Sequence, residues 1–213
     1  MPEILAILAA SVAAYLLGSI PSAKLFARLR GADIFTTGSG NMGTMNALRN
    51  VGPLVGVMTL LLDVAKGAAA VLVAGQLAGV IAPGSTLAPA LAVAAAAPMA
   101  GVGHVWSVFA RFRGGKALAV ALGVLLPGYW LIGLACLLLL GVLALVLKST
   151  NLASIIAVAV AGAAVWTLTL AGYTGDPREL IVPAGLITLV ALIVWRHLPL
   201  EEKVATEAAR APP

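Results

Sequence analysis

The chain has 213 residues, of which 62% are hydrophobic and 10% are charged, and its formal net charge at pH 7 is +5. A soluble domain carries about 25% charged residues, so this chain has too few charges to cover a water-facing surface. Disorder needs more charge and less apolar mass, and a disulfide scaffold needs more than the single cysteine present. The composition therefore predicts an integral membrane protein.

Apolar stretches without Asp, Glu, Lys or Arg predict membrane-spanning helices, because one helical crossing needs about 20 apolar residues. The two longest stretches contain the turn signals Pro83-Gly84-Ser85 and Pro127-Gly128, each of which divides its stretch into two helices. We expect an all-α, polytopic fold with seven transmembrane helices, at residues 2–22, 53–81, 87–101, 117–126, 129–147, 152–171 and 180–195. They form a single transmembrane domain at residues 1–200, followed by a short tail at residues 201–213.

Basic residues predict the orientation of these helices. Every Lys and Arg except Lys66, which lies inside the second span, and Arg178 falls on the same side of the seven spans. Because loops rich in Lys and Arg face the cytoplasm, we expect the N-terminus outside and the C-terminus in the cytoplasm. Loops facing anionic lipid account for the positive net charge, so no nucleic-acid partner is expected.

The first polar cluster is the glycine-rich loop at residues 30–52. Gly38, Gly40 and Gly43 allow positive φ and let several backbone N–H groups converge on one anion. The alternative for glycines alone is a flexible, solvated loop. A phosphate site is favoured by the polar side chains that accompany them, namely Ser39, Asn41, Asn46 and Arg49.

The second cluster ends with Gly114, Gly115 and Lys116, immediately before an apolar helix. Free N–H groups and the positive dipole end favour an anion at a helix N-terminus, and the Lys116 ammonium adds a full charge there. The spacing is not that of a P-loop, so no nucleotide is implied. We interpret Arg113, just before the glycines, as an interfacial anchor and a positive-inside charge.

Three further residues are ambiguous. Asp63 and Lys66 lie inside the second span at i, i+3 spacing and can pair. Such charges either support the site structurally or contact the substrate directly. His104 alone is more typical of a satisfied interfacial residue than of a catalyst. With two histidines in the chain and one acid inside a span, no metal site is apparent.

Two more pairs lie at helix ends on the cytoplasmic side. Asn151 and Ser154 mark the entrance of the sixth span, where either side chain could also cap the helix. Arg196 and His197 close the seventh span, where a positive side chain also favours the negative end of the helix dipole.

Several segments together resemble one known family. They read GSIPSAKLFARLRG from Gly18, DIFTTGSGNMGTMNALRNVG from Asp33, Asp63-xx-Lys66-Gly67, and GHVWSVFARFRGGKALAVALG from Gly103, with LASIIA from Leu152 and Arg196-His197 after them. In this order they resemble the bacterial acyl-phosphate:glycerol-3-phosphate acyltransferase family. The resemblance implies transfer of a fatty acyl group from acyl phosphate to the 1-hydroxyl of glycerol 3-phosphate, giving lysophosphatidate and phosphate. It also implies a site at the cytoplasmic face of the bacterial plasma membrane, without a cofactor.

The clusters and the resemblance together define an expected site. Stabilisation of developing charge is expected from Lys116 and Arg49, and either His197 or a substrate phosphate oxygen would accept the proton. The expected substrate-binding residues are Ser39, Gly40, Asn41, Asn46, Gly114, Gly115, Asn151, Ser154 and Arg196, with Asp63, Lys66 and His104 in support.

Two alternatives accompany this interpretation. The family has an asparagine where this chain has Leu200, which allows a different acceptor. The rival class is a small-anion transporter or a non-catalytic lipid-handling membrane protein that binds anions without chemistry. Many transporters are built from repeated halves, and no clear internal repeat is seen in the sequence.

Overall fold

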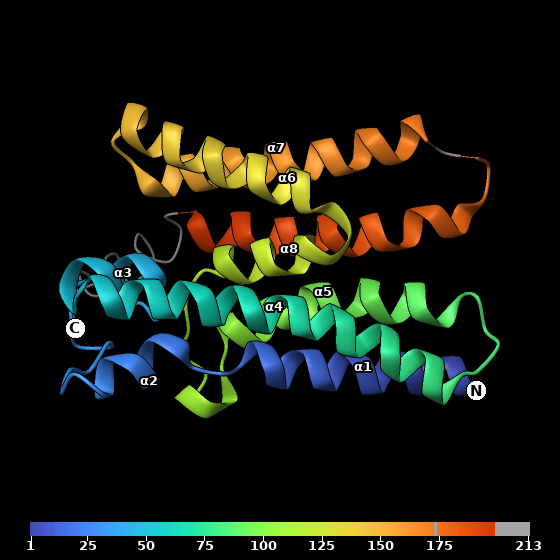
Figure 1. Cartoon of the computed structure of the whole chain (residues 1–213), viewed down its shortest axis with the longest axis horizontal. Helices are drawn as coiled ribbons and strands as arrows, with labels where there is room; N and C mark the ends of the chain where they lie inside the picture. The colour runs from blue at the N-terminus through green and yellow to red at the C-terminus, as the bar shows by residue number, and fades with distance from the viewer. Residues whose placement is uncertain (173, 199–213) are drawn as a thin grey trace, which may run out of the picture.

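The computed structural model describes residues 1–172 and 174–198, and within these residues all regular structure is helical (Figure 1). Leu200 and the expected tail at residues 201–213 lie outside the described part. The α-helices are α1 Pro2–Gly18, α2 Ser22–Arg28, α3 Thr44–Asn50, α4 Pro53–Ile81, α5 Ala88–Val105, α6 Leu118–Leu147, α7 Thr150–Ala171 and α8 Ile181–His197, with short 3-10 helices η1 Val108–Ala110 and η2 Pro177–Leu180.

Six helical segments of the described chain are long and apolar enough to cross a membrane. This finding confirms the all-α, multi-pass architecture, and the break at Pro83-Gly84-Ser85 lies as expected between α4 and α5. The expected number of seven spans is not confirmed by these six segments. The stretches expected as separate spans at 117–126 and 129–147 lie almost entirely in α6, which the non-helical residue Tyr129 divides into two helical halves.

Helix α6 reverses its direction near its middle. Tyr129 has non-helical dihedral angles (φ −134°, ψ 39°), two residues after Pro127, which cannot donate the helical hydrogen bond. A Cβ on Gly133 would lie 3.2 Å from Cδ1 of Leu122, although these residues would be about 16 Å apart in a straight helix. The two halves of α6 therefore lie side by side, as the yellow-green and yellow segments of Figure 1 show. Both ends of α6 consequently lie at one end of the bundle.

Glycines bring α4 and the first half of α6 into close contact. A Cβ on Gly67 would collide with the Val120 carbonyl, and a Cβ on Gly123 would collide with the Val64 carbonyl. Such small residues let helix backbones approach closely in lipid, where packing replaces the hydrophobic effect as the driving force. The position of the first half of α6, and of the loop that precedes it, therefore depends on these contacts.

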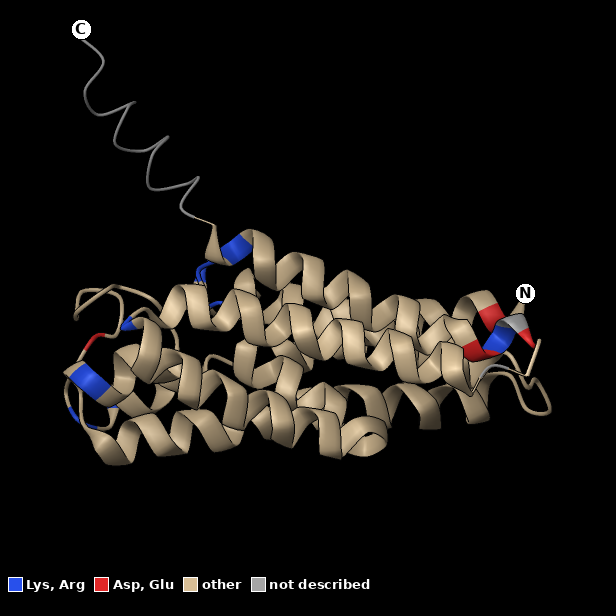
Figure 2. Ribbon diagram, turned by 90° about the horizontal axis from the view of Figure 1, so that it is seen from above, with Lys and Arg blue, Asp and Glu red and all other residues tan. Residues whose placement is uncertain are grey.

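Charged residues concentrate at the two ends of the bundle, while its middle is largely apolar (Figure 2). At one end, Glu3 accepts a 2.7 Å hydrogen bond from Ser85, and Arg178 donates a 3.0 Å hydrogen bond to Thr86. We call the opposite end the basic end. It contains the glycine-rich loop, the loop at residues 106–117, the start of α7 and the end of α8. Every residue of the expected site other than Asp63, Lys66 and His104 belongs to these four segments.

Candidate functional site at the basic end

The Asn46 side chain holds the glycine-rich loop in its conformation. Its Nδ2 atom donates hydrogen bonds to the carbonyl oxygens of Thr37 and Asn41, both at 2.9 Å, and of Ile34 at 3.2 Å. Its Oδ1 atom accepts the backbone N–H of Ser39 at 3.1 Å. Asn46 is buried and its amide is bonded on both sides, so these contacts fix the shape of the loop.

Two of the three glycines expected to have positive φ in this loop do so, whereas Gly43 is extended, with a φ of −120°. Gly38 and Gly40 have φ values of 58° and 67°, a region that favours glycine because it has no Cβ. A Cβ on Gly38 would also collide with the amide groups of Asn46 and Asn50. The loop therefore requires glycine at this position for both reasons.

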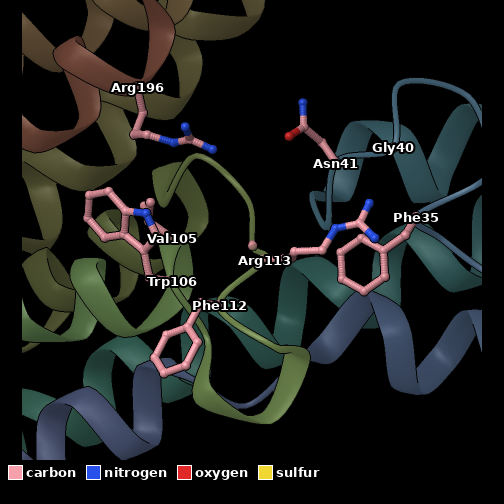
Figure 3. A pocket seen from close by; sticks show the side chains of 9 residues that line it. Phe35, Gly40, Asn41, Val105, Trp106, Phe112, Arg113 and Arg196 are labelled. Carbon is pink, nitrogen blue, oxygen red and sulfur yellow. The ribbon is translucent and has the colours of Figure 1, made fainter. Parts of the chain in front are cut away.

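A cavity of about 270 Å³ lies between the glycine-rich loop, the loop at residues 106–117 and the end of α8. Figure 3 shows the Arg196 and Asn41 side chains reaching toward the same space from opposite sides, with Arg113 nearby. Pockets for drug-sized ligands hold about 300–1,000 Å³, so this cavity suits a smaller polar group. Its lining residues are Phe35, Gly40, Asn41, Val105, Trp106, Phe112, Arg113, Gly114 and Arg196.

Arg113 belongs to the cavity, a placement that the sequence interpretation missed. Its guanidinium carbon lies 4.2 Å from the centroid of the Phe35 ring, a distance typical of a cation–π contact. This contact joins the two loops that form the cavity. A signal was present in the sequence, because Arg113 directly precedes the Gly114-Gly115 pair that predicted an anion site.

Lys116 lies beside the start of α7. Its Nζ atom donates a 2.7 Å hydrogen bond to Oδ1 of Asn151. The positive charges of Lys116 and Arg196 both act on the His197 ring. Three residues that the sequence singled out in separate segments, Lys116, Asn151 and His197, are thus brought together at the basic end.

The hydrogen bond of His197 determines where its lone pair lies. Nδ1 is 2.8 Å from the carbonyl oxygen of Ile193, one turn earlier in α8. A carbonyl oxygen can only accept, so Nδ1 carries the hydrogen, and Nε2 of the neutral ring is the acceptor. The ring is buried, which fixes its orientation.

Gly114 and Gly115 allow their loop to pack closely against α5. A Cβ on Gly114 would collide with the His104 carbonyl, and a Cβ on Gly115 would collide with the His104 ring. The N–H of Gly115 donates to the His104 carbonyl at 3.2 Å, and the Gly114 carbonyl accepts the N–H of Met42 at 3.4 Å. These contacts attach the segment that carries Arg113 and Lys116 to both α5 and the glycine-rich loop.

The charged residues inside the bundle form one buried network behind the site. As predicted, Lys66 and Asp63 pair, with 2.8 Å between Nζ and Oδ1. Lys66 also donates to the Ile20 carbonyl at 2.7 Å and lies 3.0 Å from Nδ1 of His104, while Ser22 donates to Asp63 at 2.7 Å. Neither Asp63, Lys66 nor His104 lines the cavity. Their geometry favours structural support over direct substrate contact.

The cavity contains only part of the expected site. Among the expected residues, those on its lining are Gly40, Asn41, Gly114 and Arg196, while Ser39, Arg49, Asn46, Lys116, Asn151, Ser154 and His197 are not. Ser39, in the glycine-rich loop, and Arg49, in α3, are exposed. The Ser154 hydroxyl donates to the Thr150 carbonyl at 2.6 Å within α7. The basic end therefore holds polar groups both in the cavity and beside it.

Comparison with known proteins gives a consistent result. The family model described as glycerol-3-phosphate acyltransferase matches residues 8–205. A glycerol-3-phosphate acyltransferase of Geotalea daltonii is 38% identical over 189 residues, covering 87% of each chain. One of Geobacter sulfurreducens is 41% identical over 187 residues, covering 85% of each chain.

Two solved structures share the fold. The glycerol 3-phosphate form of the integral membrane glycerol 3-phosphate acyltransferase PlsY is 31% identical, with a TM-score of 0.74. Its lysophosphatidic acid form is 32% identical, with a TM-score of 0.70. In both comparisons, 94% of this chain and 92% of the other chain are covered.

Proposed function

Because the chain belongs to the glycerol-3-phosphate acyltransferase family, and is thus a membrane enzyme of phospholipid synthesis, we propose that it takes its acyl group from acyl phosphate at the basic end. The acyl group passes to the 1-hydroxyl of glycerol 3-phosphate, and the products are lysophosphatidate and inorganic phosphate. The observation that carries this proposal is the cavity at the basic end, where two guanidinium groups adjoin a glycine-rich loop at the edge of an apolar bundle. Family membership sets the transporter alternative aside.

The reaction needs no covalent intermediate with the protein, because the acyl group passes directly between the two substrates. The acceptor oxygen forms a bond with the acyl carbon, and the bond from that carbon to the phosphate oxygen breaks. The bonding electrons leave with phosphate, and the hydroxyl proton passes to a base. Because an acyl phosphate is already activated, positioning of the two substrates and stabilisation of developing charge supply most of the acceleration.

Lys116 is placed to stabilise the developing negative charge. It lies two residues before Leu118, the first residue of α6, where the helix dipole also favours an anion. The hydrogen bond to Asn151 holds the ammonium beside α7 at 2.7 Å. Arg49 and Ser39, which are exposed on the neighbouring surface, recruit the acceptor phosphate from the aqueous side.

His197 accepts the proton of the acceptor hydroxyl. The Nδ1 hydrogen bond to the Ile193 carbonyl leaves Nε2 as the basic nitrogen. The ring is buried, which holds this nitrogen in a fixed orientation. This arrangement supports His197 as the base over a substrate phosphate oxygen.

The basic end faces the cytoplasm of a bacterial plasma membrane, with the N-terminus outside. The positive-inside rule supports this orientation. Because α6 reverses, Lys148, which follows it, also lies at the basic end and adds to the positive charge there. The C-terminus then lies in the cytoplasm, where both phosphorylated substrates are soluble or accessible.

An assay of the purified protein in detergent tests the proposed function. Radiolabelled acyl phosphate and glycerol 3-phosphate should give lysophosphatidate and an equal amount of inorganic phosphate. Replacing acyl phosphate with an acyl thioester should give no product. Acyl transfer from the thioester but not from acyl phosphate would overturn the proposed donor.

A further inference from the structure

Four basic side chains at the basic end occupy two adjacent positions. Arg113 and Arg196 line the cavity, whereas Lys116 and His197 lie beside it, near Asn151. The loop at residues 106–117 contributes Arg113 to the cavity and Lys116 to the position beside it. The end of α8 contributes Arg196 to the cavity and His197 to the position beside it. Arg113 and Lys116 are at most about 10 Å apart along an extended backbone, so the two positions are close enough for one reaction between two bound molecules.

The cavity position has the chemistry of a phosphate site. Arginine presents a planar fork of N–H donors that binds phosphate in a bidentate manner. Two such groups, from Arg113 and Arg196, balance the charge of one phosphate dianion, and the Asn41 amide lies across the same space. The contact with the Phe35 ring holds the Arg113 guanidinium at the cavity before any ligand arrives.

Apolar side chains also contribute to the cavity lining beside the two arginines. Val105, Trp106 and Phe112 contribute to the lining. Phe112 is 62% exposed and Phe109, in the same loop, is 54% exposed, so this loop presents apolar surface beside the cavity. A ligand that joins a phosphate directly to an acyl chain matches a cavity with both arginines and apolar walls.

The position beside the cavity has a different character. Asn151 and Ser154 at the start of α7 offer an amide and a hydroxyl, and His197 at the end of α8 offers an imidazole. Lys116, from the loop before α6, adds an ammonium that is bonded to Asn151. Such groups match the fully polar glycerol 3-phosphate, which has hydroxyl groups to bind and no apolar part. The cavity therefore suits the donor, which joins a phosphate to an acyl chain, and the position beside the cavity suits the fully polar acceptor.

Building on the proposed function, we propose that Arg113 and Arg196 bind the phosphate of the acyl phosphate donor, separately from the acceptor site at Lys116. After transfer, the same two arginines retain the released inorganic phosphate. Phosphate therefore competes with acyl phosphate and not with glycerol 3-phosphate. Arg113 is a binding residue for the donor, in addition to the residues expected from the sequence.

Steady-state kinetics of Arg113→Met tests this assignment, with Arg113→Lys and Arg111→Met as matched variants. Arg113→Met should raise the KM for acyl phosphate and the inhibition constant of inorganic phosphate by about 10- to 100-fold, as expected for loss of a charged hydrogen-bond donor. The KM for glycerol 3-phosphate should change by less than about threefold. Arg113→Lys should be intermediate, because it keeps the charge but not the fork. Arg111→Met should behave as wild type, because Arg111 is exposed and does not line the cavity.

A larger effect on the KM for glycerol 3-phosphate than on that for acyl phosphate would overturn the proposal, as would unchanged constants for both. If Arg113→Met is folded but inactive, calorimetric titration with inorganic phosphate decides, since weakened binding relative to wild type supports the proposal and equal binding overturns it. The circular dichroism and thermal unfolding of each variant report folding, and Arg113→Lys provides the kinetic comparison if the methionine variant does not fold. Failure of the proposed function itself is distinguishable, because the wild-type protein would then form no product from acyl phosphate.

Discussion

The Lys116 ammonium and the Asn151 side-chain oxygen lie 2.7 Å apart, although 35 positions separate them in the chain. The helix between them, α6, has 30 residues and would be about 45 Å long if it were straight. The contact is possible because α6 turns back at Tyr129. It brings the Gly114-Gly115-Lys116 motif to the start of α7, and so assembles a site from segments that the sequence shows only separately.

The orientation of the bundle predicts a pattern of chemical labelling. On a Cys136→Ser background, single cysteines at Thr37 and Ser149 should resist a membrane-impermeant thiol reagent in intact cells, because both lie at the basic end. A cysteine at Thr174, in the connection that contains Arg178, should react. The reverse pattern would show that the basic end faces outward.

The sequence predicted those parts of the site that depend on local chemistry. The φ values of Gly38 and Gly40 and the pairing of Asp63 with Lys66 are confirmed, because they follow from glycine's missing Cβ and from helical spacing. The role of Arg113 could not be predicted in the same way. From sequence alone, an arginine in a cytoplasmic loop is explained equally well as a positive-inside charge and as a ligand-binding residue. Its contact with the Phe35 ring, in a loop distant in sequence, distinguishes the two, and only the structure shows that contact.

The number of spans also depends on contacts that the sequence does not show. The Pro127-Gly128 signal predicted a change of direction, and the chain does reverse there. Whether the two flanking segments count as separate helices depends on the local hydrogen bonding around the turn and on packing against α4 and α7. Composition does not reveal these contacts.

Asn46→Ala should loosen the glycine-rich loop. The substitution leaves the Ser39 N–H without its acceptor and removes the side-chain donor from the Ile34, Thr37 and Asn41 carbonyls. Loss of about 1–3 kcal/mol in the free energy of unfolding is expected, together with higher KM values for both substrates. Thermal unfolding in detergent and initial rates measure the two effects.

The matched control is Asn50→Ala, which removes only the bonds from an exposed side chain to Asn46. A change within about 0.5 kcal/mol is expected for such a surface position. Equal effects of the two substitutions would contradict the organising role of Asn46.

Lys66→Met should destabilise the bundle strongly, because it leaves the buried Asp63 carboxylate without its cation. Breaking a buried ion pair from one side costs about 3–5 kcal/mol. The double variant Asp63→Asn, Lys66→Met should be less destabilised than Lys66→Met alone, since no uncompensated charge remains. Thermal unfolding of the three proteins provides the comparison, and a double variant that is no more stable than the single one would contradict the charge argument.

Gly67→Ala should displace the first half of α6, because the new Cβ meets the Val120 carbonyl. Overpacking of this kind costs about 1–3 kcal/mol, and Lys116, just before α6, should lose alignment and activity. Gly79→Ala in the same helix is the control, since nothing lies within 4 Å of its Cβ position. Similar thermal unfolding of the two variants would show that the close approach of α4 and α6 is not required.

The rate of Lys116→Met tests the central claim, that acyl transfer occurs at the basic end with Lys116 stabilising the developing charge. Methionine keeps much of the apolar stem and removes the ammonium, so packing should survive. By analogy with the loss of one preorganised donor, the initial rate with acyl phosphate and glycerol 3-phosphate should fall about 100- to 1,000-fold. Arg111→Met should remain near the wild-type rate, with thermal unfolding as the folding control for both. Near-normal rates for a folded Lys116→Met protein would contradict the claim and remove Lys116 from the site.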